Sequence, residues 1–179
     1  MPTRERSPGS EADDAIAELY AAHWTRLVRL AWLLVRDQSV AEDTVQDAFV
    51  ATHRRWGSIR DSGRVVSYLQ TAVVNRCRSV QRHAVVVDRQ NRAEAGGADV
   101  PGRASHDSAE SAALAAAERH TMLAALDRLP QRQREVLVLR YYEDLSEAQI
   151  AHTLDISPGS VKAHAHRALT TLRATMEPS

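Results

Sequence analysis

The C-terminal part of the chain contains side chains whose types and spacing suit a contact with nucleic acid. In the segment LDISPGSVKAHAHRAL (154–169), a Ser-Pro-Gly break separates two helix-like pieces. Residues 156–176 hold Lys162, Arg167 and Arg173 but no aspartate or glutamate. Lysine and arginine bond phosphate oxygens and the edges of guanine bases. The pattern therefore predicts a helix that contacts DNA.

The residues around this helix have the pattern of a helix-turn-helix. Two short helices joined by about four residues, the second of them basic, are typical of that motif. Ser146 with Gln149 makes a capping box that begins the first helix, and Ile150 and Leu154 are expected to face the core. Asp155 occupies the turn, where a residue tolerant of positive φ is needed. Ser157 is expected to cap the last helix, with Pro158 at its first position.

The last helix is expected to have an apolar face and a DNA-contacting face. At 100° per residue, Val161, Ala165, Ala168 and Leu172 share the inward side. The face expected to contact DNA consists of Ser160, Lys162, Ala163, His166, Arg167 and Arg173. Its N-terminal part, from Ser160 to Arg167, is expected to enter a major groove of the duplex. A protein–protein use of the same motif remains open. His164 and His166 are two residues apart, about 200° around the helix, so they cannot chelate one ion and no metal site is expected.

A second stripe of polar and aromatic residues is predicted on a helix at 65–83. Tyr68, Asn75, Arg78 and Arg82 share its exposed side, and Trp56 precedes it by one loop. Arginines follow a phosphate backbone while rings and amides meet unstacked bases, so this set suits single-stranded DNA. An ordinary basic surface is the alternative. Arg76 projects nearer the core, and we expect it to form an ion pair with an acid of the preceding helix. Leu69, Val73, Val80 and Val66 are expected on the buried side of the same helix.

Composition restricts the class of protein. Alanine and arginine are abundant in the 179 residues, whereas there are only 7 glycines and 6 prolines, which favours helix over sheet. The single cysteine, Cys77, excludes an intrachain disulfide and indicates a reducing, cytoplasmic location. No apolar run approaches the roughly 18 residues that a membrane span needs. We find no nucleophile–base pair, phosphate loop or metal cluster, so neither an enzyme nor a cofactor is expected.

The formal net charge of zero conceals blocks of opposite sign. Residues 11–49 hold three arginines and eight acidic residues, whereas residues 50–92 hold nine arginines and two aspartates. Separated blocks of charge indicate separate partners, with solvated helix faces as the alternative.

Hydrophobic periodicity predicts an all-α chain of two small helical domains. Helices are expected at about 16–34, 40–56 and 65–83, the second opened by a capping box of Ser39 and Glu42. Periodicity resumes at 112, and Pro130 suits the first turn of a further helix. We predict a disordered tail at 1–13, a first domain at 14–83, a flexible linker at 84–111 and a second domain at 112–176.

Three segments together resemble a known family. AEDTVQDAFVATHRRW (41–56), SYLQTAVVNRCRSVQRH (67–83) and the block from Leu129 to Arg173 are similar to regions 2 and 4 of bacterial RNA polymerase sigma factors of the sigma-70 family. Their order and spacing resemble the small extracytoplasmic-function (ECF) class. The segment SVKAHAHRAL resembles the actinobacterial sigma-E-type members of that class.

The resemblance implies a function and a set of partners. It implies that region 2 melts and reads the −10 promoter element through the loop at 57–66, Asn75 and its neighbours, and that region 4 reads the −35 element as duplex. Asp43, Gln46 and Asp47 match the face that docks on the β′ clamp helices of core RNA polymerase. The β flap of the polymerase, promoter DNA and a separate anti-sigma factor are the other partners implied. The location implied is the cytoplasm of a bacterium, at the nucleoid when bound to polymerase.

Two alternatives from other classes remain. A stand-alone helix-turn-helix regulator would use the C-terminal motif, with residues 11–83 as a sensor or dimerisation domain. It would bind a palindromic duplex without polymerase. An adaptor that binds polymerase without DNA would give the basic stripes no partner.

Overall fold

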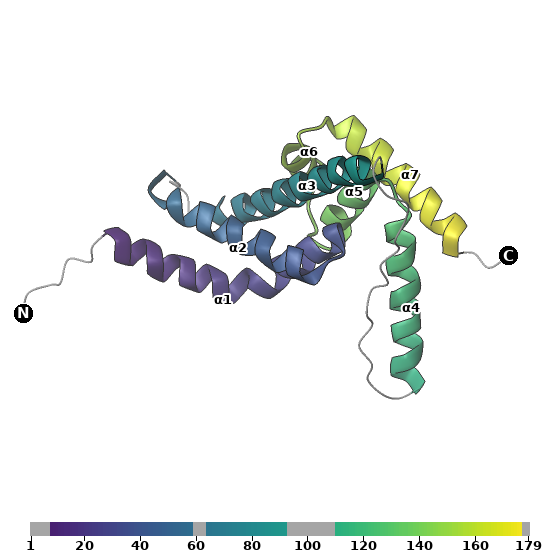
Figure 1. Cartoon of the computed structure of the whole chain (residues 1–179), viewed down its shortest axis with the longest axis horizontal. Helices are drawn as coiled ribbons and strands as arrows, with labels where there is room; N and C mark the ends of the chain where they lie inside the picture. Colours follow the sequence, from purple (N-terminus) through teal and green to yellow (C-terminus); the bar gives the residue numbers. More distant parts are fainter. Residues whose placement is uncertain (1–7, 59–63, 93–109, 177–179) are drawn as a thin grey trace, which may run out of the picture. The chain divides into compact units, whose positions relative to one another are not determined.

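The computed structural model describes residues 8–58, 64–92 and 110–176, and every regular element in these ranges is helical (Figure 1). This confirms the all-α prediction. The elements are α1 (Pro8–Val35), α2 (Gln38–Arg54), the 3-10 helix η1 (Trp56–Ser58), α3 (Val65–Arg92), α4 (Glu110–Asp127), α5 (Gln131–Tyr141), α6 (Glu147–Leu154) and α7 (Pro158–Met176). The chain divides into two compact units, and the boundary falls after Val85, within α3.

The first unit is built on α1 and α2, which pack along each other and are joined by a two-residue turn. Arg36 ends α1 in the left-handed region at φ 61°, and its guanidinium lies 3.9 Å from the centroid of the Trp32 ring. Cation–π contact of this kind holds the side chain of an otherwise strained residue. The interior is aliphatic and lies between the two helices, with Leu27, Leu30, Ala31, Leu34, Ala41, Val45, Ala48 and Phe49 buried.

The N-cap of α2 differs from the prediction. The Oδ1 atom of Asp37 accepts a hydrogen bond of 2.9 Å from the backbone N–H of Val40, so Asp37 is the cap and Ser39 lies inside the helix. The predicted capping box of Ser39 and Glu42 was therefore wrong. Glu42 instead accepts a hydrogen bond from Gln38 one turn earlier. An aspartate directly before the helix satisfies its free N–H groups without the box.

The buried side of α3 was only partly predicted. Leu69 and Val73 are buried as expected, and Val65, Val74 and Cys77 join them. Val66 is half-buried, but Val80 is 38% exposed, so its predicted burial was wrong. Beyond Cys77 the next position one turn along the buried face is Gln81, whose Nε2 donates a 2.6 Å hydrogen bond to the carbonyl of Leu34.

Two helices extend past the predicted domain boundaries. α1 begins at Pro8, so residues 8–13 of the predicted tail are helical, with Ala12 buried and the Asp13 carboxylate 2.7 Å from His53 Nε2. α3 continues to Arg92, nine residues into the predicted linker. No glycine or proline occurs between Val65 and Arg92, so the sequence holds no strong helix-stop signal there. Residues 93–109 of that linker, and 1–7 of the tail, lie outside the described residues.

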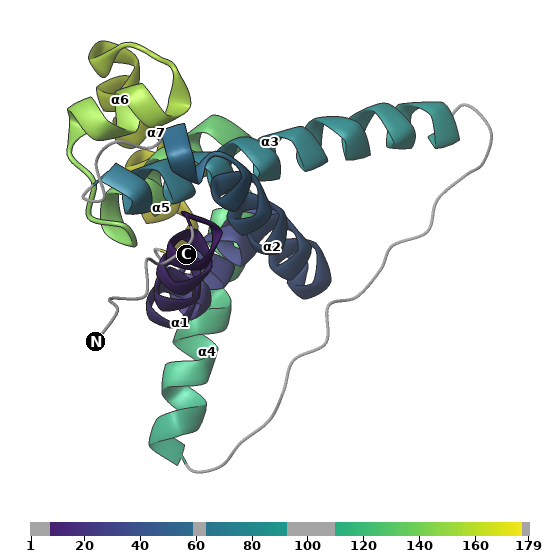
Figure 2. The same ribbon diagram turned by 90° about the vertical axis from the view of Figure 1, so that its left-hand side faces the viewer.

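The second unit consists of α4, α5, α6 and α7, with α7 packed against the other three. Figure 2 shows α5, α6 and α7 gathered at one end of the view, in green to yellow. Its core includes Ala125 and Leu129, Leu137 of α5, and Ala168 and Leu172 of α7. Pro130 is the N-cap of α5, one position before the predicted first turn. The buried Glu135 carboxylate accepts hydrogen bonds from Gln131 and Arg132, at 2.8 and 2.9 Å, which offsets the cost of its desolvation.

Candidate nucleic-acid and partner interfaces

Side-chain caps fix the corner of the helix-turn-helix. Ser146 Oγ accepts from the Gln149 N–H at 3.3 Å and Gln149 Oε1 accepts from the Ser146 N–H at 2.8 Å, which confirms the predicted capping box. α6 ends at Leu154, and its C-cap Asp155 is in the left-handed conformation at φ 53° and ψ 55°, as the turn required. Ser157 Oγ then accepts from the Ser160 N–H at 3.1 Å and begins α7. These local bonds, with the left-handed Asp155 between them, fix where α6 begins and ends and where α7 begins.

The two faces of α7 are those predicted. Val161, Ala165, Ala168 and Leu172 are buried, as are Ile150 and Leu154 of α6. The outward residues Lys162, His166, Arg167 and Arg173 are exposed, while Ser160 and Ala163 are half-buried. From Lys162 to Arg173 the helix rises about 16 Å, so its cations are spread over roughly three turns. That spacing suits contacts along a groove better than a single small anion.

An acidic residue that the sequence did not single out lies beside this face. Glu147 is the first residue of α6, and its Oε2 atom lies 3.6 Å from Lys162 Nζ. Its Oε1 atom lies 3.5 Å from Nη1 of Arg140 on α5. The position directly after the Ser146 cap is a common one for an acid, because the free N–H groups of a helix start favour negative charge. Contact with two other helices could not be read from that position.

The predicted stripe residues lie along α3, and two of them, Asn75 and Arg78, contact each other. Asn75 and Arg82 are exposed, whereas Tyr68 and Arg78 are half-buried. Arg78 Nη1 donates to Asn75 Oδ1 at 3.4 Å, and Arg82 Nη2 donates to Ser79 Oγ at 3.2 Å. Spacing of three residues puts each pair on neighbouring turns. The stripe therefore presents two polar pairs, each made of an arginine and an amide or hydroxyl group.

At the Tyr68 end of the stripe lies an arginine that the sequence did not single out. Arg55, the C-cap of α2, donates from Nη1 to the Tyr68 hydroxyl at 3.4 Å. Trp56 is half-buried in η1 and lines a hollow of about 340 Å³ with Val65 and the α1 residues Ala15, Glu18, Leu19 and Ala22. Most of the loop that follows Trp56, at residues 59–63, lies outside the described residues.

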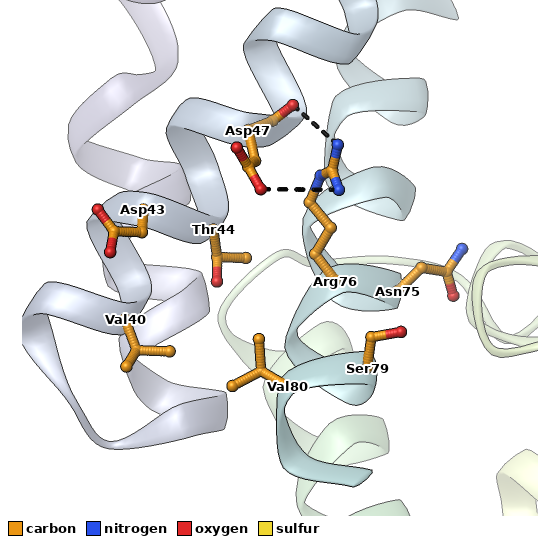
Figure 3. Close-up of a pocket in the computed structure, with 8 residues that line it drawn as sticks. All are labelled: Val40, Asp43, Thr44, Asp47, Asn75, Arg76, Ser79 and Val80. Atoms are coloured by element: carbon orange, nitrogen blue, oxygen red, sulfur yellow. Dashed lines mark hydrogen bonds and ion pairs between the residues drawn. The ribbon is translucent and has the colours of Figure 1, made fainter. Parts of the chain in front are cut away.

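A groove of about 500 Å³ runs between α2 and α3 (Figure 3). It is lined from α2 by Val40, Asp43, Thr44 and Asp47, and from α3 by Asn75, Arg76, Ser79 and Val80. Two of the three predicted polymerase-docking residues, Asp43 and Asp47, thus lie along the same groove as Asn75 of the α3 stripe. The third, Gln46, is exposed on α2. Val80 is an apolar residue that lines this groove, which explains why it lies outside the core.

The expected ion pair of Arg76 is confirmed, and its partner is Asp47. Arg76 Nη2 donates to the backbone carbonyl of Asp47 at 3.0 Å, and Nη1 lies 3.9 Å from the Asp47 Oδ2 atom. In Figure 3 both contacts reach across the groove, while the Asp43 carboxylate points away from Arg76. The contacts tie α2 to α3 and leave the Asp43 and Asp47 carboxylates on the exposed side of α2.

The described residues hold no metal-ligand cluster and no membrane-spanning helix. They contain no group of three or more histidine, cysteine, aspartate or glutamate side chains placed to hold a metal ion. Among their helices, none has the length and apolar character that crossing a membrane requires.

Known families and proteins match both units. Residues 19–84 match the model of sigma-70 region 2, and residues 119–172 match that of sigma-70 region 4. An RNA polymerase sigma-E factor of Streptomyces avermitilis is 33% identical over 84% of this chain and 79% of its own length. The ECF RNA polymerase sigma factor SigM of Mycobacterium tuberculosis is 34% identical over 86% of this chain and 73% of its own.

A solved structure has the same fold. The sigma factor RpoE of Bartonella quintana, in a co-crystal with the anti-sigma factor NepR, aligns with a TM-score of 0.70 at 21% identity. The alignment covers 92% of this chain and 97% of that one.

The chain belongs to the sigma-70 family of RNA polymerase sigma factors, and its relatives include ECF members. Proteins of this family are transcription initiation factors that act with core RNA polymerase to recognise promoters, and they are not enzymes. The predicted family and the general function are therefore confirmed. The assignment of individual residues to each partner remains a proposal.

Proposed function

We propose that the first unit binds polymerase and single-stranded DNA at the same time through two surfaces of opposite charge. The carrying observation is the α2–α3 groove, which has the exposed acids Asp43 and Asp47 on its α2 wall. Asn75 on its α3 wall belongs to the stripe that also holds the cations Arg78 and Arg82. Asp43, Gln46 and Asp47 contact the β′ clamp helices. Arg76 holds the two walls together and contacts neither partner.

The α3 stripe receives the −10 element once it is single-stranded. Arg78 and Arg82 follow the phosphates, while the Asn75 amide and the Tyr68 and Trp56 rings meet unstacked bases. The contact between Arg78 and Asn75 supports this assignment, because it holds a cation and a base-reading amide side by side. Arg55 joins the set through its bond to Tyr68.

The second unit reads the −35 element as duplex. Arg167 and His166 lie exposed on the side of α7 that faces the DNA major groove, with Lys162 near the start of the helix and Arg173 toward its end. Arginine reads guanine by a bidentate contact in the major groove, whereas lysine and the terminal arginine suit phosphates. The β flap of the polymerase is the partner that holds this unit on core.

We also propose a regulator and a location, with the family as support. An anti-sigma factor is a further partner, supported by the solved structure of RpoE with its anti-sigma factor NepR. The protein acts in the bacterial cytoplasm, at the nucleoid when it is bound to polymerase.

The deciding experiment is run-off transcription with core polymerase of the same bacterium and fragmented genomic DNA, with and without this protein. Discrete transcripts that depend on the protein are expected, and they identify its promoters. Failure to produce transcripts, together with tight binding of the protein alone to palindromic duplex, would instead support a stand-alone regulator.

A further inference from the structure

We propose that Glu147 sets how strongly the α7 surface, the exposed face that holds Lys162, Arg167 and Arg173, binds DNA. It does so by competing with DNA phosphates for Lys162. The inference rests on the proposed role of α7 as the duplex-binding helix. It is carried by the contacts of one carboxylate with cations of two other helices.

The geometry makes Glu147 an internal counter-ion of the DNA-contacting surface. Its two oxygens approach different cations, Oε2 at 3.6 Å from Lys162 Nζ and Oε1 at 3.5 Å from Arg140 Nη1. Its side chain is 32% exposed, less than that of Lys162 at 69%. The carboxylate is therefore held by the protein, and the ammonium is the partner that can turn outward.

The chemistry of a carboxylate between two cations resembles that of a phosphate. A DNA phosphate is also an anion that accepts bonds from lysine and arginine. Each protein cation that neutralises a phosphate releases counterions from the DNA and so strengthens binding. Lys162 can satisfy Glu147 or a phosphate, but its ion pair with Glu147 must weaken when it turns to DNA. An exposed ion pair is weak, so the competition lowers the affinity without preventing binding.

The consequence concerns the free protein. Non-specific binding to duplex is supplied almost entirely by phosphate contacts. By neutralising one of the cations on α7, Glu147 reduces that binding and leaves the base-reading residues Arg167 and His166 untouched. The protein alone then spends less time on random DNA, and promoter binding depends more on delivery by polymerase.

The test measures binding of the full chain to a labelled duplex of random sequence by fluorescence anisotropy over a series of salt concentrations. Glu147→Gln keeps the size of the side chain and removes its charge. We expect about two- to five-fold tighter binding at low salt, the range of an exposed ion pair. The slope of log K against log salt should steepen by up to about one.

The chain offers a matched control. Asp144 lies in the turn before α6, is exposed, and has a φ of 53° that asparagine also tolerates. Asp144→Asn removes the same charge three residues away, and we expect it to change the affinity much less. In a Lys162→Gln background, Glu147→Gln should have no further effect. Far-UV circular dichroism and a thermal melt of each variant establish that it is folded.

Three outcomes would overturn the inference. They are unchanged or weaker binding by Glu147→Gln, an equal gain in Asp144→Asn, and a gain that persists without Lys162. A fourth outcome, absence of duplex binding by both the wild-type protein and Glu147→Gln at low salt, would overturn it as well. Run-off transcription by the wild-type protein separates these failures from failure of the proposed function, because a sigma factor that lacks this competition still directs transcripts.

Discussion

At the scale of single residues, the polymerase-docking assignment depends on exposed carboxylates of α2. Asp43 is the sharper position to test, because its carboxylate points away from Arg76 whereas Asp47 contacts that arginine. We expect Asp43→Lys to weaken binding to core polymerase by at least about tenfold, since a like charge at a complementary interface is strongly unfavourable. The affinity can be measured with a fluorescently labelled protein and purified core.

Glu18→Lys is the matched control for this charge reversal. Glu18 is an exposed acid on α1, and its reversal changes the net charge by the same amount. Equal losses of affinity in the two variants would show that binding to core polymerase depends on total charge and not on the α2 surface. Asp47→Lys should also abolish core binding, but it places an ammonium beside Arg76, so a melt must accompany it.

Arg167 is the residue whose loss separates base reading from phosphate contact. It is exposed on the third turn of α7, on the face proposed to contact DNA. Arg167→Ala should cost about 1–3 kcal/mol of binding free energy on a promoter identified by run-off transcription, if the guanidinium meets a base edge. Holoenzyme binding to that promoter and to versions substituted in the −35 element measures the effect.

Arg128→Ala provides the comparison for Arg167. Arg128 is an exposed arginine beyond the end of α4, and no DNA contact is proposed for it. A loss by Arg167→Ala that is the same on every sequence would make Arg167 a phosphate contact. A similar loss by Arg128→Ala would show that total charge governs the affinity.

At the scale of elements, the turn between α6 and α7 contains a residue that its conformation does not favour. Asp155 has φ 53°, a region where glycine has no steric cost and aspartate has some. Asp155→Gly should stabilise the second unit by up to about 1 kcal/mol, and Asp155→Val should destabilise it by more. Amide hydrogen exchange of Val161 and Leu172 reports this unit alone, because both are buried in its core. Faster exchange in Asp155→Gly would contradict the argument.

The helices themselves could be predicted from sequence because each has an amphipathic face and most have a readable start. The start of α6 was predicted from Ser146 with Gln149, and the start of α7 from Ser157 with Pro158. Both caps are confirmed. The start of α2 was misread because Ser39 also suits a cap, and only the backbone geometry shows that Asp37 takes that role.

The relation between helices could not be predicted in the same way. The groove between α2 and α3 depends on the rotation of each helix about its axis, which periodicity fixes only roughly. An error of about one position placed Val80 in the core when it lines the groove. The contacts of Glu147 depend on three helices at once, so they too required the structure.

At the scale of the whole molecule, segregation of charge matters more than the net charge. With 23 basic and 23 acidic residues, a uniform distribution would give little attraction to DNA or to an acidic or basic protein surface. The acids of α2 and the cations of α3 and α7 instead form separate surfaces, for which we propose different partners. A neutral chain can thereby bind both a polyanion and a protein.

This view predicts that the free chain binds random duplex with a definite dependence on salt. On random duplex Arg167 has no cognate base to read and is expected to contact a phosphate, as Arg173 and, in part, Lys162 do. The slope of log K against log salt should then lie between about −2 and −3. The smaller magnitude applies when Glu147 retains Lys162. Arg173→Gln should reduce the slope by about one, whereas Arg128→Gln should leave it unchanged, because only the first of these arginines belongs to the α7 surface. Anisotropy titrations at four or more salt concentrations measure the slopes. A slope near zero would mean that the net charge governs the free protein after all, and a much steeper slope would require the α3 stripe to bind duplex as well.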